Sequence, residues 1–306
     1  MVERRHTADS ADRQCVDLSV ELCGIKLSAP LIPAAGTLGK EALEEAKGGY
    51  GAILPKTVTL RPRAGNPPPR LTEVSSGMIN SIGLQNPGLE SFLRNLDDYN
   101  IGLPLFVSVA ADTVGEFTEM CRRLAGDERI SAVELNLSCP NIEHGGLQFC
   151  SAPGSVAEVV ASCRSAVSGK PLFAKLTNEG VVANATAAED AGADSLTLVN
   201  TIPSLVVDAH EQRVFLRGGL SGPAIKPIAL RAVYDVSKIV QVPVVGCGGV
   251  TSGTDVAEYM LAGAAAVQVG VGSFVREPSE ILGEFASYLK ENRLRAADLT
   301  RLMAEY

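Results

Sequence analysis

One hexapeptide of this chain places a thiol among amide and hydroxyl side chains, a combination suited to proton or nucleophile chemistry. It runs Asn136-Leu-Ser-Cys-Pro-Asn141 and follows the apolar segment Ile130 to Leu135, which we interpret as a buried strand. Cys139 therefore falls in the loop beyond the C-terminal end of that strand. Taken alone, the hexapeptide would equally fit a buried structural cysteine in a tight proline turn.

Polar residues also stand at the ends of other apolar segments. Lys56-Thr57, Lys175 and Asn200-Thr201 each close or directly follow one, as Asn136 does. A lysine after one isolated strand is more often a surface residue. Several such residues at equivalent strand ends converge on one centre if the strands form a barrel, so we expect them to share a site.

Glycine clusters follow two later apolar segments, in Gly246-Cys-Gly-Gly-Val250 and Gly270-Val-Gly-Ser-Phe274. Each cluster alone could be a tight turn. At the ends of the last two strands of a barrel, however, such turns let backbone N–H groups close on a phosphate. A further run, Gly218-Gly-Leu-Ser-Gly222, allows another close backbone approach.

The elements that must position these residues alternate along the chain. Continuous apolar segments, typical of parallel strands buried on both faces, alternate with amphipathic segments. The pattern predicts an α/β protein with a (β/α)8 TIM barrel; a doubly wound sheet is the alternative. The predicted strands are Leu31–Pro33, Gly51–Leu54, Leu105–Val109, Ala132–Leu135, Leu172–Lys175, Ser195–Val199, Val244–Gly246 and Ala266–Val269. The predicted helices include Asp112–Ala125, Val156–Val167, Val182–Ala191, Ile225–Ile239 and Thr254–Leu261, with starts at Asp112-Thr113, Ser155 and Ser252.

Three connections are longer than their helices require, namely those after strands 2, 4 and 6. All three emerge on the C-terminal face of a barrel, where sites are built. The first carries residues 61–70 and 80–86, the second carries Cys139, and the third runs from Asn200 to Gly222. We expect one catalytic domain over residues 1–306, with residues 1–17 as a loosely ordered extension.

Composition excludes several classes of function. A content of 46% hydrophobic and 5% aromatic residues, with a net charge of −8, disfavours nucleic-acid binding. None of the seven cysteines forms a Cys-x-x-Cys pair, so neither a zinc site nor a disulfide framework is expected. The polar N-terminus and the lack of a long apolar stretch predict no membrane anchor and a cytoplasmic location.

The residues alone thus predict a barrel with a phosphorylated ligand, two cations and an amide-lined pocket. They leave flavin, sugar phosphate and pyridoxal phosphate open. Lysines beside a flavin would stabilise the negative charge that builds at N1 on reduction.

The order and spacing of several motifs resolve this choice, because they resemble the dihydroorotate dehydrogenase family. The resemblance runs from about Leu18 to Glu291. The motifs are Lys56-Thr-Val-Thr59, Gly65-Asn-Pro67, Asn80-x-Ile-Gly-Leu-Gln-Asn-Pro87, Asn136-Leu-Ser-Cys-Pro-Asn141, Gly218-Gly-Leu-Ser-Gly-Pro-Ala-Ile-Lys-Pro227 and Cys247-Gly-Gly-Val250.

The resemblance implies oxidation of (S)-dihydroorotate to orotate in pyrimidine biosynthesis, with Cys139 as the base at C5 and hydride transfer from C6 to N5 of FMN. It places Lys175 at the N1/O2 edge of the flavin. The implied FMN-binding residues are Ala35, Gly36, Lys56, Thr57, Ser108, Asn136, Lys175, Val199, Gly222, Gly248, Gly249, Gly270 and Val271. The implied substrate-binding residues are Lys56, Asn80, Ser81, Ile82, Gly83, Leu84, Asn136, Asn141, Asn200 and Thr201.

Cysteine at the base position and the absence of an apolar N-terminal extension resemble class 1. Within it, the Gln85-Asn86-Pro87 ending and the run from Gly218 to Pro227 resemble class 1B. This implies a homodimer core within a heterotetramer, whose iron–sulfur and FAD subunit passes electrons to NAD. A fumarate-using class 1A enzyme, a flavin barrel acting on another dihydropyrimidine and a non-catalytic barrel subunit are the alternatives.

Three positions depart from the family pattern. Ala35, Ser108 and Val271 stand where Ser, Asn and Thr respectively are expected, and each removes or shortens a polar contact. The segment Leu205–Arg217 matches no motif, and we interpret its His210 as part of a solvated loop.

Overall fold

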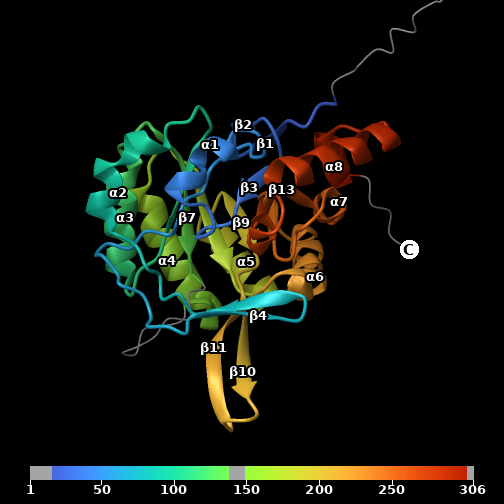
Figure 1. The fold of residues 1–306 in the computed structure, drawn as a ribbon. Coiled ribbons are helices and arrows are strands. Elements are labelled where there is room, and N and C mark those ends of the chain that lie inside the picture. Colours follow the sequence, from blue (N-terminus) through green and yellow to red (C-terminus); the bar gives the residue numbers. More distant parts are fainter. Residues whose placement is uncertain (1–15, 138–148, 302–306) are drawn as a thin grey trace, which may run out of the picture.

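Seven parallel strands form one curled sheet in the computed structural model, which describes residues 16–137 and 149–301 (Figure 1). Their order across the sheet is β3-β13-β12-β9-β8-β7-β6. Almost every residue in them is buried, because side chains fill the inside and helices cover the outside. The strands are β3 Leu31–Pro33, β6 Leu105–Val109, β7 Ile130–Asn136, β8 Leu172–Leu176, β9 Ser195–Leu198, β12 Val244–Cys247 and β13 Ala264–Val269.

The segment 51–58 closes the gap between β3 and β6. The Gly51 N–H donates to the Leu31 carbonyl at 2.8 Å, and Ile53 and Val58 form isolated parallel bridges to β6. The predicted strand at Gly51–Leu54 is therefore not a regular strand, although it occupies the second strand position. Pro55 follows it directly, and proline has no N–H with which to continue a ladder.

Eight α-helices in the described residues follow the eight barrel positions, and the predicted βα alternation is confirmed. Thr113 caps α3, and Ser252 forms a capping box with Asp255 at α7. Ser155 does not start a helix, because Pro153 already begins α4. The helices are α1 Leu43–Ala46, α2 Leu89–Arg94, α3 Val114–Ala125, α4 Pro153–Ala166, α5 Val181–Asp190, α6 Lys226–Ser237, α7 Gly253–Leu261 and α8 Pro278–Asn292.

A four-stranded antiparallel sheet, which the sequence did not predict, joins the two longest connections. Its order is β10-β11-β5-β4, and β11 pairs with β5 so that Gly219 faces Asn80. The strands are β4 Leu71–Val74, β5 Gly77–Asn80, β10 Ile202–Asp208 and β11 Arg213–Ser221. The β10–β11 hairpin projects from the barrel (Figure 1). His210 lies in the turn of this hairpin and is exposed.

Smaller elements complete the described chain. The hairpin of β1 (Val20–Leu22) and β2 (Ile25–Leu27) precedes the barrel. Short 3-10 helices lie at Lys40–Ala42, Leu96–Tyr99, Phe149–Ser151, Pro223–Ile225, Val271–Phe274 and Ala296–Arg301. Within residues 16–137 and 149–301, no helix combines the length and hydropathy needed to span a bilayer.

Candidate active site

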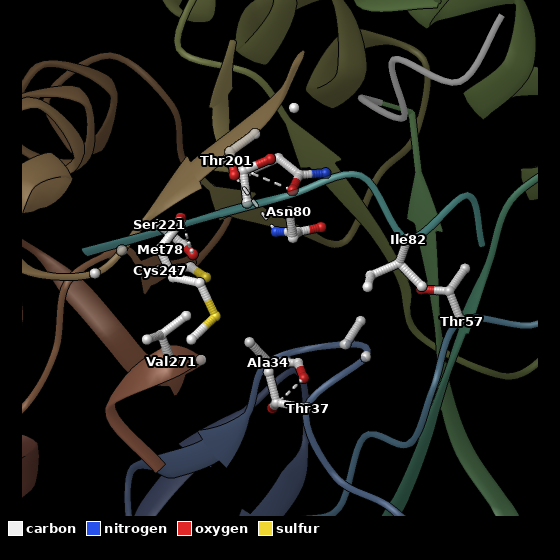
Figure 2. Close-up of a pocket in the computed structure, with 18 of the residues that line it drawn as sticks. Ala34, Thr37, Thr57, Met78, Asn80, Ile82, Thr201, Ser221, Cys247 and Val271 are labelled. Atoms are coloured by element: carbon white, nitrogen blue, oxygen red, sulfur yellow. Dashed lines mark hydrogen bonds between the residues drawn. The ribbon is translucent and has the colours of Figure 1, made fainter. Parts of the chain in front are cut away.

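A cavity of about 350 Å³ opens at the C-terminal ends of the barrel strands, within the size range of small-molecule sites. Figure 2 shows labelled side chains around an open centre, with Asn80 and Thr201 on one side and Ala34 and Thr37 opposite. Because the strands are parallel, their carboxyl ends all deliver residues to this one face.

The cavity brings together nearly all the site residues expected from the sequence. Cys139 and Asn141 lie outside the described residues. Ser108 does not line the cavity, but its Oγ lies 3.0 Å from Oγ1 of Thr57, which does. The predicted residues that line it are Ala35, Gly36, Lys56, Thr57, Asn80, Ser81, Ile82, Gly83, Leu84, Asn136, Lys175, Val199, Asn200, Thr201, Gly222, Gly248, Gly249, Gly270 and Val271.

Several lining residues were not expected. Leu71 and Met78 come from the β4–β5 hairpin, which local sequence patterns did not reveal. Cys247 and Phe274 lie inside the two glycine motifs, in which the phosphate prediction rests on the glycines alone. The position of Cys247 inside a motif could have identified it as a site residue. Leu71 lies in no motif, and nothing in the sequence around it indicates a site.

The amide side chains on one side of the cavity are held by each other and by backbone groups. Nδ2 of Asn200 donates to Oδ1 of Asn136 at 3.1 Å, which couples the segment after β9 to the end of β7. Oδ1 of Asn200 accepts from the Thr201 N–H at 2.8 Å. On β5, Nδ2 of Asn80 donates to the Gly219 carbonyl at 3.4 Å. Amide groups held in this way can recognise a planar ring that carries both carbonyl and N–H groups.

The loop that carries Gly83 and Leu84 is fixed by one buried amide. Oδ1 of Asn86 accepts from the backbone N–H groups of Thr59 and Gly88, and its Nδ2 donates to the Leu84 carbonyl at 2.7 Å. Gly83 and Leu84 both have positive φ, at 76° and 53°. The bonds from Asn86 stabilise this unusual backbone and present it to the cavity.

A buried cation lies at the cavity floor. Lys175 is only 4% exposed, and its Nζ donates to Oε1 of Gln268 at 2.8 Å. Burial favours a lower Lys175 pKa, but the neighbouring Cys247 sulfur and Glu134 carboxylate outweigh it and the pKa is raised. Burial also raises the pKa of Cys247. Glu134 is thus the acidic side chain that contributes to raising the Lys175 pKa.

At another part of the cavity, two glycine turns offer backbone donors. Among the described residues, none accepts a hydrogen bond from the N–H of Gly249 or Gly270. Gly249 has φ +69°, and a Cβ there would lie 2.7 Å from Cβ of Lys226. Gly36, by contrast, lines open space, because a Cβ on it would meet no atom within 4 Å. Two donors at barrel strands seven and eight fit a phosphate, and the space beside Gly36 fits the body of the same ligand.

Comparisons with known proteins show what the chain as a whole is similar to. A family model described as dihydroorotate dehydrogenase matches residues 17–287. A protein of Geobacter sp. (strain M21), described as dihydroorotate dehydrogenase B (NAD(+)), catalytic subunit, is 41% identical, covering 92% of this chain and 95% of its own. A protein of Geotalea uraniireducens (strain Rf4) with the same description is 42% identical, with coverages of 94% and 97%. The crystal structure of DHODH from Eimeria tenella in complex with ferulenol superposes with a TM-score of 0.79 at 24% identity, covering 95% of this chain and 89% of that one, which shows the shared fold.

Proposed function

The chain belongs to the dihydroorotate dehydrogenase family, within class 1B, and we propose that it oxidises (S)-dihydroorotate to orotate in de novo synthesis of UMP. The observation that carries the proposal is the composition of one cavity. It combines a buried lysine, a set of fixed amides and two glycine turns whose N–H donors have no acceptor in the part of the chain that the structure describes. These groups match a phosphorylated, electron-accepting cofactor next to a planar polar substrate.

FMN is the cofactor that these residues fit. Its phosphate would be held at the Gly248-Gly249 and Gly270-Val271 turns, and Gly36 would leave room for its body. Lys175 would hold the N1/O2 edge, where its positive charge stabilises negative charge. When bound, FMN supplies the acceptor for the hydride that leaves C6 of the substrate.

The substrate would be recognised by amide side chains and by backbone groups around Gly83 and Leu84. Asn80, Asn136 and Asn200 line the cavity, and Lys56 lies at its edge with an exposed side chain that can meet the substrate carboxylate. Cys139, outside the described residues, is proposed to take the C5 proton. Removal of this proton and of the C6 hydride leaves the C5–C6 double bond of orotate.

The electrons are proposed to pass to NAD through a partner subunit that carries FAD and an iron–sulfur cluster. The relatives are named as NAD(+)-linked catalytic subunits, which supports a second subunit. We propose that two copies of this chain form the core of a cytoplasmic heterotetramer.

An acceptor assay tests the proposed function and separates it from its alternatives. The purified chain should oxidise dihydroorotate with an artificial dye as acceptor, but should reduce NAD only after the partner subunit is added. Turnover with fumarate by the chain alone would favour the class 1A alternative. Oxidation of dihydrouracil in place of dihydroorotate would contradict the assigned substrate, and no turnover with either would favour the non-catalytic alternative.

The rate of substrate oxidation is expected to increase from pH 6 to pH 9. A cysteine base acts as its thiolate, and the reference thiol pKa of about 8.5 places much of the deprotonation in this interval. Lys175 does not oppose the increase, because its raised pKa keeps it charged. Anaerobic stopped-flow mixing with dihydroorotate at several pH values measures the profile, and a rate that falls with pH would contradict a thiolate base.

Gly249→Ala is expected to lower the affinity for FMN at least tenfold. The added Cβ would approach Cβ of Lys226 at 2.7 Å and the Gly222 carbonyl oxygen at 2.8 Å, on a backbone whose positive φ already disfavours alanine. Fluorescence titration of the apoprotein with FMN gives the dissociation constant. Gly126→Ala is the matched control, because a Cβ there meets no atom within 4 Å. Equal affinity in the two variants would argue against a role for this turn.

A further inference from the structure

We infer that Glu134 is a positioning residue that acts through Gln268 to orient and charge-balance Lys175. The inference rests on the proposed function, in which Lys175 contacts FMN. Glu134 does not line the cavity, and the sequence motifs gave it no role. The position of Glu134 inside the barrel and its hydrogen bonds indicate a role for it.

Glu134 belongs to a polar layer directly beneath the cavity floor. Thr197 and Gln268 share this layer, and the three residues come from alternate barrel strands, β7, β9 and β13. Lys175 and Cys247 belong to the intervening strands β8 and β12. Alternation of this kind is how TIM-barrel interiors are layered, although bulky branched apolar side chains are their usual content. Here all three layer residues are at most 2% exposed and polar.

The hydrogen bonds in this layer fix which way the Gln268 amide faces. Oε2 of Glu134 accepts from Nε2 of Gln268 at 2.7 Å and from Oγ1 of Thr197 at 2.9 Å. A carboxylate can only accept, so it holds the NH2 end of Gln268 toward itself. The oxygen end is then left to accept from Nζ of Lys175 at 2.8 Å. Glu134 thus determines where the ammonium group of Lys175 is held.

Charge gives a second reason for the same assignment. A buried ammonium group is stable only with an anion nearby, and Glu134 is fully buried together with Lys175. Among the described residues, Oε1 of Glu134 has no hydrogen-bond partner. Hydrogen-bond donors therefore reach only one of the two carboxylate oxygens of Glu134. The positive charge of Lys175, on the other side of the Gln268 amide, stabilises the remaining negative charge.

The direction in which Glu134→Gln shifts the equilibrium between oxidised and reduced FMN shows whether Glu134 acts by orienting Gln268 or only through its charge. Removing a buried anion by Glu134→Gln would, through space alone, favour the reduced flavin, because the site becomes more positive. If Glu134 instead orients Gln268, the new amide at position 134 can donate, and Gln268 can turn its NH2 group toward Lys175. The ammonium group then loses its acceptor and is displaced, so the oxidised flavin is favoured.

The test is a double-mutant cycle read out as the equilibrium between oxidised and reduced FMN. Wild type, Glu134→Gln, Gln268→Met and the double variant are titrated against a redox dye. Each single substitution should shift the equilibrium about tenfold toward oxidised FMN, which is about 30 mV for a two-electron couple. In the Gln268→Met background, Glu134→Gln should add less than twofold, since the residue through which it acts is gone.

Thr197→Val is the matched control, because it removes a bond to Glu134 without breaking the link to Lys175. It should shift the equilibrium less than twofold. A shift toward reduced FMN in Glu134→Gln, or equal shifts in both backgrounds, would overturn the inference. If Glu134→Gln fails to fold, the comparison of Gln268→Met with Thr197→Val tests the inference. Equal shifts of the FMN equilibrium in these two variants would overturn the inference. A wild-type chain that binds no FMN would overturn the proposed function together with this inference.

Discussion

Cys139→Ala is expected to leave FMN bound and to slow flavin reduction by dihydroorotate about 10²- to 10⁴-fold, the usual contribution of a positioned general base. The alanine side chain cannot take the C5 proton, whereas the residues proposed to hold FMN are unchanged. Single-turnover mixing under anaerobic conditions measures the reduction step directly, without interference from the electron acceptor.

Cys23→Ala is the control for loss of a cysteine as such. Cys23 lies in the β1–β2 turn, and burial raises its pKa to about 12, so it cannot serve as a base near neutral pH. Its variant should reduce at the wild-type rate. A Cys139→Ala protein that also reduces within twofold of wild type would remove Cys139 from the proposed role.

Lys175→Met is expected to weaken FMN binding about a hundredfold and to destabilise the fold. The substitution removes the cation at the cavity floor and leaves Glu134 as an uncompensated buried charge, which typically costs about 3–5 kcal/mol. The FMN dissociation constant and the melting temperature of the apoprotein measure the two effects separately. Because Glu134 lies inside the protein whether or not FMN is bound, the melting temperature should fall in both states.

The exposed Lys290 on α8 provides the matched control. Lys290→Met removes the same charge from the surface, where burial plays no part, and should leave both measurements unchanged. An FMN affinity in Lys175→Met equal to that of the Lys290→Met protein would contradict the placement of FMN at Lys175.

The barrel was predictable because its strands are continuous apolar runs. β6, for example, is buried at every position and carries its signal in its own sequence. The β10–β11 hairpin was not predictable in the same way. The residues of β10 are partly buried or exposed rather than buried, and Pro203 lies among them. The residues of β11 follow no regular alternation, and its partner strand β5 lies far away in the chain. Such pairing depends on contacts that no local pattern contains.

In the site, too, some residues could be recognised from the local sequence and others only from the folded barrel. Polar residues at or just beyond strand ends, such as Lys175 in β8 and Asn200 after β9, were predictable because their types are unusual at the end of an apolar run. The layer beneath them was missed, although a glutamate within the predicted strand Ala132–Leu135 was a visible anomaly. Its meaning depends on Gln268, which only the closed barrel brings within hydrogen-bonding distance.

The absorbance spectrum of the purified chain, recorded before and after anaerobic addition of dihydroorotate, tests the central claim most directly. We predict a flavin spectrum that bleaches on addition of this substrate, which would establish the cofactor, the substrate and the first half of the reaction together. A bound flavin that stays oxidised would contradict the assigned substrate. A colourless protein that cannot be reconstituted with FMN would contradict the proposed function as a whole.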